Sequence, residues 1–197
     1  NVNGEKTKIK RYLPTHKEAV ELLFEVLLNP EYGIIKDMDE IKAIGHRIVH
    51  GGPIVFPTLV DQKVIDTLEY AKRFAPLHNP GAIAGILGVE EVAPGKPNVI
   101  VVDTGFHADI PEENAVYAIP YKYYEEDAIK RYGAHGISHK YIAMKTAEHL
   151  GKDVEDTNVI TVHLGNGASI TAVKNGKSYD TSMGLTPLEG LVMGTRS

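Results

Sequence analysis

Residues 98–103 have the sequence Asn-Val-Ile-Val-Val-Asp, a short apolar run that ends in a carboxylate. Pro97 bounds the run on one side and Asp103 bounds it on the other. A continuous run of β-branched residues, without polar alternation, is typical of a strand that is buried on both faces. We therefore predict a strand over 98–102, inside an α/β domain, with Asp103 at its carboxyl end.

Further helix and strand signals lie on the N-terminal side of this run. Thr15 and Glu18 have the spacing of a capping box, and apolar residues follow at helical spacing. The other predicted elements are a strand over 41–49, a helix capped by Asp61 and a helix capped by Asn79 that reaches about Val92. This mixture of helices and buried strands places the chain in the α/β class.

The segment after Asp103 changes character. Residues 104–135 are irregular and rich in tyrosine, and Ser138 is expected to cap a helix that ends at Gly151. From residue 158 onward, β-rich runs alternate with Asn-Gly turns. Such turns between β-rich runs predict consecutive hairpins.

The composition excludes several classes of function. The 197-residue chain has a net charge of −5, which argues against a nucleic-acid surface built on bulk positive charge. It has no cysteine, so neither a disulfide framework nor a cysteine zinc site is possible. No apolar run approaches the length of a membrane span, and the polar start does not resemble a signal peptide. We expect a cytoplasmic protein without membrane or nucleic-acid partners.

Arg47 lies within the sequence His-Arg-Ile-Val-His at 46–50, in the predicted strand over 41–49. Two histidines four residues apart can chelate zinc on a helix, but on a strand they stand roughly 13 Å apart and cannot share an ion. Histidines in the core of a buried strand are the alternative. An arginine in an apolar run needs an anionic partner, which makes Arg47 a candidate for anion binding.

Asp103 and His135 are the next candidates. Asp103 follows the predicted strand at the end where α/β sheets place their ligand crevice, and a carboxylate there can hold Mg²⁺ or orient a nucleophile. The alternative is a structural aspartate that caps the turn at Thr104-Gly105. His135 and His139 flank a turn that leads into a helix, and on local grounds either histidine can be structural.

The common phosphate-binding loops are absent, because the sequence contains neither a Walker A loop nor a GxGxxG fingerprint. The segment 163–167, His-Leu-Gly-Asn-Gly, instead leads a strand into a turn whose small residues let a phosphate approach backbone N–H groups. The same residues also suit an ordinary hairpin turn. Arg196 follows a Gly-rich stretch beside small hydroxyl residues, as an oxyanion clamp would.

Taken together, these segments resemble the acetate kinases. The similarity is specific over residues 41–197 and looser before them. The matching stretches follow the family's order and are 45–52 (GHRIVHGG), 75–80 (APLHNP), 102–107 (VDTGFH), 131–139 (RYGAHGISH), 163–169 (HLGNGAS) and 180–197 (DTSMGLTPLEGLVMGTRS).

The resemblance implies ribonuclease-H-like α/β domains of the actin-like ATPase superfamily. The first, acid-side domain would span 1–107, and the beginning of the nucleotide-binding domain would span 108–197. The change in composition near residues 104–110 agrees with this boundary. The chain opens without Met and stops inside a matching stretch, so we expect it to be truncated at both ends and inactive alone.

The implied activity is reversible transfer of the γ-phosphoryl group of ATP to acetate. ATP or ADP and Mg²⁺ would be the cofactors, acetyl phosphate the product, and a homodimer the assembly of the full-length enzyme. Arg47 and Arg196 would hold the carboxylate and the transferring phosphoryl group. His135 would donate to a phosphoryl oxygen in the transition state, and Asp103 would hold Mg²⁺ and orient the attacking oxygen.

The resemblance also implies two sets of binding residues. The phosphate-facing hairpin would comprise His163, Gly165, Asn166 and Gly167. The pocket for the methyl group of acetate would be lined by Val49, Leu77 and Pro187, together with Arg47 for the carboxylate.

The sequence departs from the family pattern at Ala134, where Phe is common, and also at Gly105 and Ile137. A smaller residue beside the methyl pocket leaves the preference between acetate and propionate open. The alternatives are therefore a propionate or butyrate kinase of the same superfamily, and a non-catalytic actin-like nucleotide-binding protein. A zinc hydrolase built from the nine histidines is a third alternative.

Overall fold

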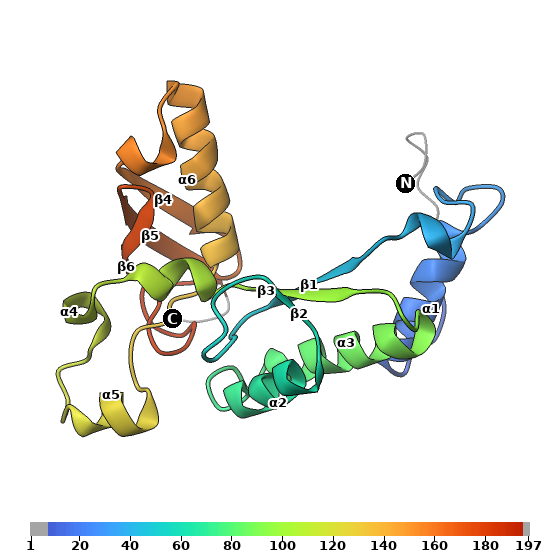
Figure 1. Ribbon diagram of the computed structural model, residues 1–197, viewed down its shortest axis with the longest axis horizontal. Coiled ribbons are helices and arrows are strands. Elements are labelled where there is room, and N and C mark those ends of the chain that lie inside the picture. Colours follow the sequence, from blue (N-terminus) through green and yellow to red (C-terminus); the bar gives the residue numbers. More distant parts are fainter. Residues whose placement is uncertain (1–7, 195–197) are drawn as a thin grey trace.

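The computed structural model describes residues 8–194, which form two lobes, each around a three-stranded sheet (Figure 1). The first sheet has the order β1-β3-β2 and consists of β1 (Ile44–Ile48), β2 (Thr58–Leu59) and β3 (Asn98–Val102). Strands β1 and β3 are parallel, and β2 pairs with β3 in the antiparallel sense. The second sheet is antiparallel, has the order β4-β5-β6, and consists of β4 (Val159–Leu164), β5 (Ala168–Lys174) and β6 (Lys177–Thr181).

The first lobe contains α1 (His16–Leu27), α2 (Gln62–Ala71) and α3 (Asn79–Val92), and the second contains α6 (Gly136–Leu150), which packs on β4 (Figure 1). Among the longer helices of the first lobe, α3 packs on β1 and α1 packs on α3. The short elements are η1 (Met38–Glu40), η2 (Gly105–Asp109), α4 (Glu112–Ala115), α5 (Lys122–Asp127) and η3 (Val154–Asp156). Within residues 8–194, no helix has the length and apolar character needed to cross a membrane.

The core of the first lobe fixes the position of β3. Ile100 and Val102 point to one face of the strand and pack with buried Leu68 of α2 and Ile86 of α3. Burying such a side chain stabilises a fold by roughly 1.5–3 kcal/mol relative to exposure. The opposite face of β3 is only half-buried. The predicted strand over 98–102 is therefore confirmed. The prediction that both of its faces are buried holds for one face only.

Several predicted element boundaries are confirmed. Thr15 is the N-cap of α1, and its backbone N–H donates to Oε2 of Glu18 at 3.1 Å, as a capping box requires. The Asp61 carboxylate accepts from the backbone N–H of Val64 at 2.8 Å and caps α2. Gly151 ends α6, and the hairpins β4–β5 and β5–β6 form as predicted.

The predicted cap at Ser138 is wrong. Helix α6 begins earlier, at Gly136, and His135 occupies the N-cap position. The Ser138 hydroxyl lies 3.0 Å from Nδ1 of His163 instead. The local pattern predicted that Ser138 caps the helix start, but its side chain instead contacts His163 on the distant strand β4.

The predicted cap at Asn79 is also wrong. His78 is at the N-cap position of α3, and Asn79 is the first helical residue. The Asn79 amide is fully buried, where Nδ2 donates to the carbonyl oxygen of His50 at 2.8 Å and Oδ1 accepts from the His50 backbone N–H at 3.4 Å. The side chain thus joins α3 to the segment that follows β1.

We expect Asn79→Ala to lower the free energy of unfolding by about 2 kcal/mol, because it leaves a buried backbone N–H and C=O of His50 without partners. Urea denaturation of the complete protein measures this change. Asn29→Ala is the matched control, because the Asn29 side chain accepts hydrogen bonds in a partly exposed turn. Equal losses in the two variants would mean that the hydrogen bonds from Asn79 to His50 contribute no more stability than those of the Asn29 turn.

The connection between the lobes runs through η2. This element follows β3 directly and packs against β6 and α6 of the second lobe. The predicted domain boundary after residue 107 falls inside η2, so the exact division into domains remains a prediction.

Candidate active site

The carboxyl ends of β1 and β3 bring Arg47 and Asp103 together. Because the two strands are parallel neighbours with Arg47 opposite Val101, residues at their ends lie side by side. Arg47 donates to both carboxylate oxygens of Asp103, with Nε 3.2 Å from Oδ1 and Nη2 2.5 Å from Oδ2. The Asp103 side chain is 2% exposed, whereas that of Arg47 is 60% exposed. The anionic partner that the sequence required for Arg47 is therefore Asp103, and the guanidinium also faces solvent.

The N-terminus of α6 packs directly on this strand end. The backbone N–H of Gly136 donates to the carbonyl oxygen of Asp103 at 2.9 Å. A Cβ atom at position 136 would overlap that oxygen and lie 3.0 Å from Cβ of Phe106. The preceding residue, His135, has a φ of 59°, a left-handed conformation that is uncommon for residues other than glycine. This backbone turn carries the His135 ring to the strand end.

The His135 ring is held on two sides. It stacks on His163 with the ring centroids 4.0 Å apart, and its Nδ1 lies 2.8 Å from Oγ of Ser169. Burial lowers the pKa of His135 to about 4, and the neighbouring His163 adds to this effect. The free protein therefore holds His135 as a neutral imidazole near pH 7.

Four of the predicted residues line one pocket of about 550 Å³. The complete lining is Arg47, Asp103, His135, Ile137, Ser138, Tyr141 and His163. The pocket thus combines a guanidinium, a carboxylate and two imidazoles at the ends of parallel strands. This combination suits a small anion that must be held while charge moves between its oxygen atoms.

The hairpin predicted to face phosphate forms between β4 and β5, and its turn residues are not part of the pocket lining. Gly165, Asn166 and Gly167 join β4 to β5, and the N–H of Gly165 donates to the carbonyl oxygen of Gly167 at 2.9 Å. A Cβ atom at position 165 would meet nothing closer than 3.4 Å. The packing of the turn therefore does not require glycine at position 165. The close approach of a ligand to the backbone can account for glycine there instead.

The residues expected around the methyl group are not part of this pocket. Val49 is half-buried after β1, Leu77 is 88% exposed, and Pro187 lies in the irregular segment after β6. Ala134 is buried in a cluster with Met183 and Met193 and is not among the residues that line the pocket. Their role at the methyl group remains a prediction. Arg196 lies outside the described residues.

The histidines at 46 and 50 have separate surroundings. Nε2 of His46 lies 2.8 Å from Oδ1 of Asn98, whereas His50 is buried and stacks on Phe74 with the ring centroids 4.7 Å apart. Among residues 8–194, no group of three or more histidine and acidic side chains is placed to hold a metal ion. His50 is thus a core histidine, as the structural alternative proposed.

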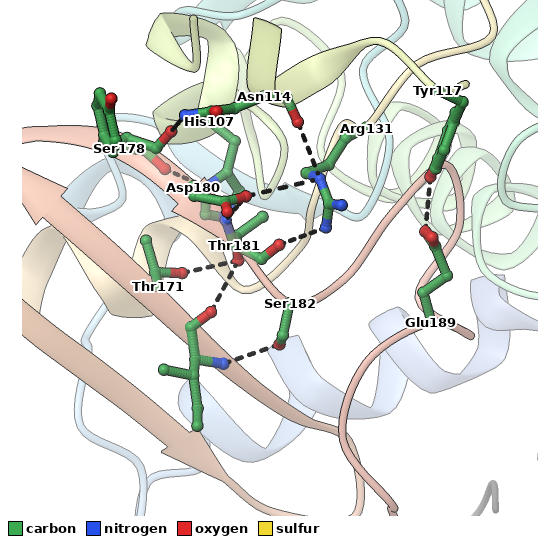
Figure 2. A network of polar contacts seen from close by, with 12 residues as sticks. His107, Asn114, Tyr117, Arg131, Thr171, Ser178, Asp180, Thr181, Ser182 and Glu189 are labelled. Carbon is green, nitrogen blue, oxygen red and sulfur yellow. Dashed lines mark hydrogen bonds and ion pairs between the residues drawn. The ribbon is translucent and has the colours of Figure 1, made fainter. Parts of the chain in front are cut away.

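Arg131 anchors the segment that leads to His135 (Figure 2). Its Nη1 donates to the carbonyl oxygen of Thr181 at 2.5 Å, and its Nε donates to the carbonyl oxygen of Asn114 at 3.2 Å. Nε also lies 3.6 Å from Oδ1 of Asp180, and the Thr181 hydroxyl lies 2.8 Å from that of Thr171. These bonds fasten Arg131 to β6 and to α4.

The sequence offered little sign of Arg131, Ser169 or Tyr141 as site residues. Arg131 and Ser169 lie within the matching stretches, but no local pattern distinguishes an arginine that binds carbonyl groups or a serine between two histidines. Tyr141 lies on α6 outside those stretches. Ser169 and Tyr141 reach the site through the packing of β5 and α6 at the strand end, whereas Arg131 is placed by its bonds to Asn114 and Thr181.

The chain is similar to acetate kinases throughout. The family model of the acetokinase family matches residues 1–197. The acetate kinase of Caldanaerobacter subterraneus subsp. tengcongensis is 57% identical over 194 residues, which are 98% of this chain and 48% of that protein. The acetate kinase of Finegoldia magna is 53% identical over all of this chain and 50% of that protein. The chain thus spans about half the length of the curated relatives it matches.

Solved structures agree with this similarity. The crystal structure of Porphyromonas gingivalis acetate kinase superposes with a TM-score of 0.92 at 45% identity, over 99% of this chain and 49% of that chain. A propionate kinase from Francisella tularensis gives a TM-score of 0.87 at 45% identity, over 96% of this chain and 48% of that chain. The fold is therefore the mixed α/β fold of these acid kinases, consistent with an actin-like ATPase domain. The chain belongs to the acetokinase family.

Proposed function

We propose that the complete protein transfers the γ-phosphoryl group of ATP to acetate, and transfers it back from acetyl phosphate to ADP. The observation that carries this proposal is the pocket at the strand ends, where Arg47, Asp103 and His135 meet in a chain of the acetokinase family. The relatives named above are acetate kinases, which supports acetate as the acid.

The chemistry requires positioning more than acid–base catalysis. An acetate-like acid is already ionised at neutral pH, so its oxygen needs no general base. The exposed fork of Arg47 can hold the carboxylate or the phosphoryl oxygens, and Arg196 would supply a second guanidinium. The His135 ring can donate to a phosphoryl oxygen as its charge grows in an in-line transfer.

Asp103 fits the role of a Mg²⁺ ligand. Mg²⁺ in phosphoryl-transfer sites usually takes one or two carboxylates, with phosphate oxygens and water completing its shell. Asp103 is the carboxylate that lines the pocket, and its charge is balanced by Arg47. The ion would neutralise charge on the phosphate oxygens when bound.

The nucleotide would lie on the side of the second lobe. His163 lines the pocket, and the turn at 165–167 continues from it, so this hairpin would face the phosphates of ATP. The division into an acid-side domain over 1–107 and a nucleotide domain over 108–197 belongs to the same proposal. So do a homodimer and a cytoplasmic location.

The test is expression of the complete protein and an assay of ATP-dependent acyl phosphate formation, with the product trapped by hydroxylamine. Turnover with acetate supports the proposal. Micromolar binding of ATP without turnover on any acid with two to four carbons would favour a non-catalytic, actin-like nucleotide-binding protein instead.

Propionate is the second candidate acid, because a propionate kinase matches at 45% identity. A buried methylene is worth about 0.8 kcal/mol, and pockets of this kind discriminate by about 1–3 kcal/mol. We expect kcat/KM for propionate within about tenfold of that for acetate. Steady-state kinetics on both acids measures this ratio. Rejection of propionate by a hundredfold or more would shift attention to Ile137, which lines the pocket.

A further inference from the structure

Ser169 lies between two histidine rings. Its hydroxyl oxygen is 2.8 Å from Nδ1 of His135 and 2.8 Å from Nε2 of His139. Ser169 is 0% exposed and His139 is 1% exposed. A buried hydroxyl hydrogen needs an acceptor, and within the described residues these two nitrogens are the partners of the Ser169 hydroxyl, so it donates to one nitrogen and accepts from the other. One of the two nitrogens must therefore carry a hydrogen and the other must not.

His139 continues the chain of hydrogen bonds to β4. Its Nδ1 lies 2.7 Å from the hydroxyl of Thr161, which is 3.4 Å from the carbonyl oxygen of Thr171. Burial lowers the pKa of His139 to about 3, so this ring is neutral and carries one N–H. The state of its Nε2 therefore fixes the opposite state of its Nδ1.

Two arrangements of hydrogens let the Ser169 hydroxyl donate to one ring and accept from the other. In the first, Nδ1 of both rings carries hydrogen, Ser169 donates to His139, and Thr161 donates to the carbonyl oxygen of Thr171. In the second, Nε2 of both rings carries hydrogen, Ser169 donates to His135, and Thr161 donates to His139. Both neutral rings thus hold the same tautomer, and only the second arrangement gives His135 an Nε2–H.

We propose that Ser169 is a positioning residue that couples the tautomers of His135 and His139, so that Thr161 controls whether His135 offers an N–H to the pocket. Within the described residues, Nδ1 of His135 is taken by Ser169 and Nε2 has no protein partner. A phosphoryl oxygen can only accept hydrogen bonds, so it selects the second arrangement. The role in phosphoryl transfer rests on the proposed function, whereas the coupling does not.

The direct test is ¹⁵N NMR of the histidine rings in the complete protein, with and without inorganic phosphate as the probe. We expect His135 and His139 to show the same tautomer in each sample, and phosphate to increase the Nε2–H form of both together. Opposite tautomers in the two rings, or a change in one ring alone, would overturn the coupling.

Variants at Thr161 test the relay at a distance from the pocket. Thr161→Val removes the hydroxyl, and Thr161→Ser keeps it while removing the methyl group. If donation by His135 contributes as one hydrogen-bond donor to a developing oxyanion does, Thr161→Val and Ser169→Ala should each lower kcat by up to about a hundredfold with little change in KM. Thr161→Ser should retain most of the rate. Equal rates for the Val and Ser variants would contradict the relay.

Ser178→Ala is the matched control, because the buried Ser178 hydroxyl lies 2.8 Å from Nδ1 of His107, which does not line the pocket. We expect this variant to leave the tautomers of His135 and His139 and the value of kcat unchanged. Coupled tautomers in a protein without kinase activity would leave the inference standing and reject the proposed function. Kinase activity with uncoupled tautomers would reject the inference and support the proposed function.

Discussion

Replacing Arg47 or Arg196 by alanine in the complete protein is expected to lower kcat for acyl phosphate formation by at least about a hundredfold. That factor corresponds to roughly 3 kcal/mol of transition-state stabilisation, the usual loss when one donor to a developing anion is removed. Arg47 lies at the pocket with an exposed guanidinium, and the role of Arg196 rests on the family resemblance. A wild-type rate in either variant would remove that arginine from the site.

The Arg47→Ala variant needs a control for folding. It leaves the carboxylate of Asp103, which is 2% exposed, without its cation, and a buried charge without a partner destabilises a fold. Arg47→Lys keeps the positive charge but loses the planar fork. We expect the lysine variant to fold with a near-native Tm and to remain at least about tenfold slow, because a point charge does not replace bidentate binding.

Gly136→Ala is expected to lower the free energy of unfolding by about 3 kcal/mol, at the upper end of overpacking effects. The added methyl group would overlap the carbonyl oxygen of Asp103, and neither α6 nor β3 can move without breaking the hydrogen bond between them. Denaturant unfolding of the complete protein measures the loss. An unchanged stability would mean that the helix start is less tightly packed than the structure indicates.

Gly85→Ala is the matched control. Gly85 lies inside α3, and a Cβ atom there would meet nothing within 4 Å. Alanine is favoured over glycine in helix interiors by about 0.5–1 kcal/mol. The same substitution should therefore stabilise the protein at position 85 and destabilise it at position 136.

Local patterns predicted the regular elements well. The strand over 98–102 and the cap at Asp61 follow from signals within a few residues, and the structure has both. The hairpins after residue 158 follow from Asn-Gly turns between β-rich runs, and their pairing is confirmed. These features depend on backbone preference and nearby side chains, so one stretch of sequence is enough to specify them.

The errors arose where a polar side chain binds a distant segment. Asn79 and Ser138 both stand at plausible cap positions, yet one binds the backbone of His50 and the other contacts His163. Ser169 looks like any polar residue of a strand until α6 brings His135 and His139 beside it. The geometry of the site depends on such contacts between segments, and these appear only once the sheet and α6 are packed.

The hydrogen bond from Gly136 to Asp103 has a consequence for any closing movement of the two lobes. It ties the start of α6 to the end of β3 through main-chain atoms. The spacing between the Arg47–Asp103 pair and the His135 ring is thus set by backbone geometry rather than by long side chains. If the lobes close, the Arg47–Asp103 pair and the His135 ring would move together as one rigid unit. The bending would then have to occur in other segments of the chain.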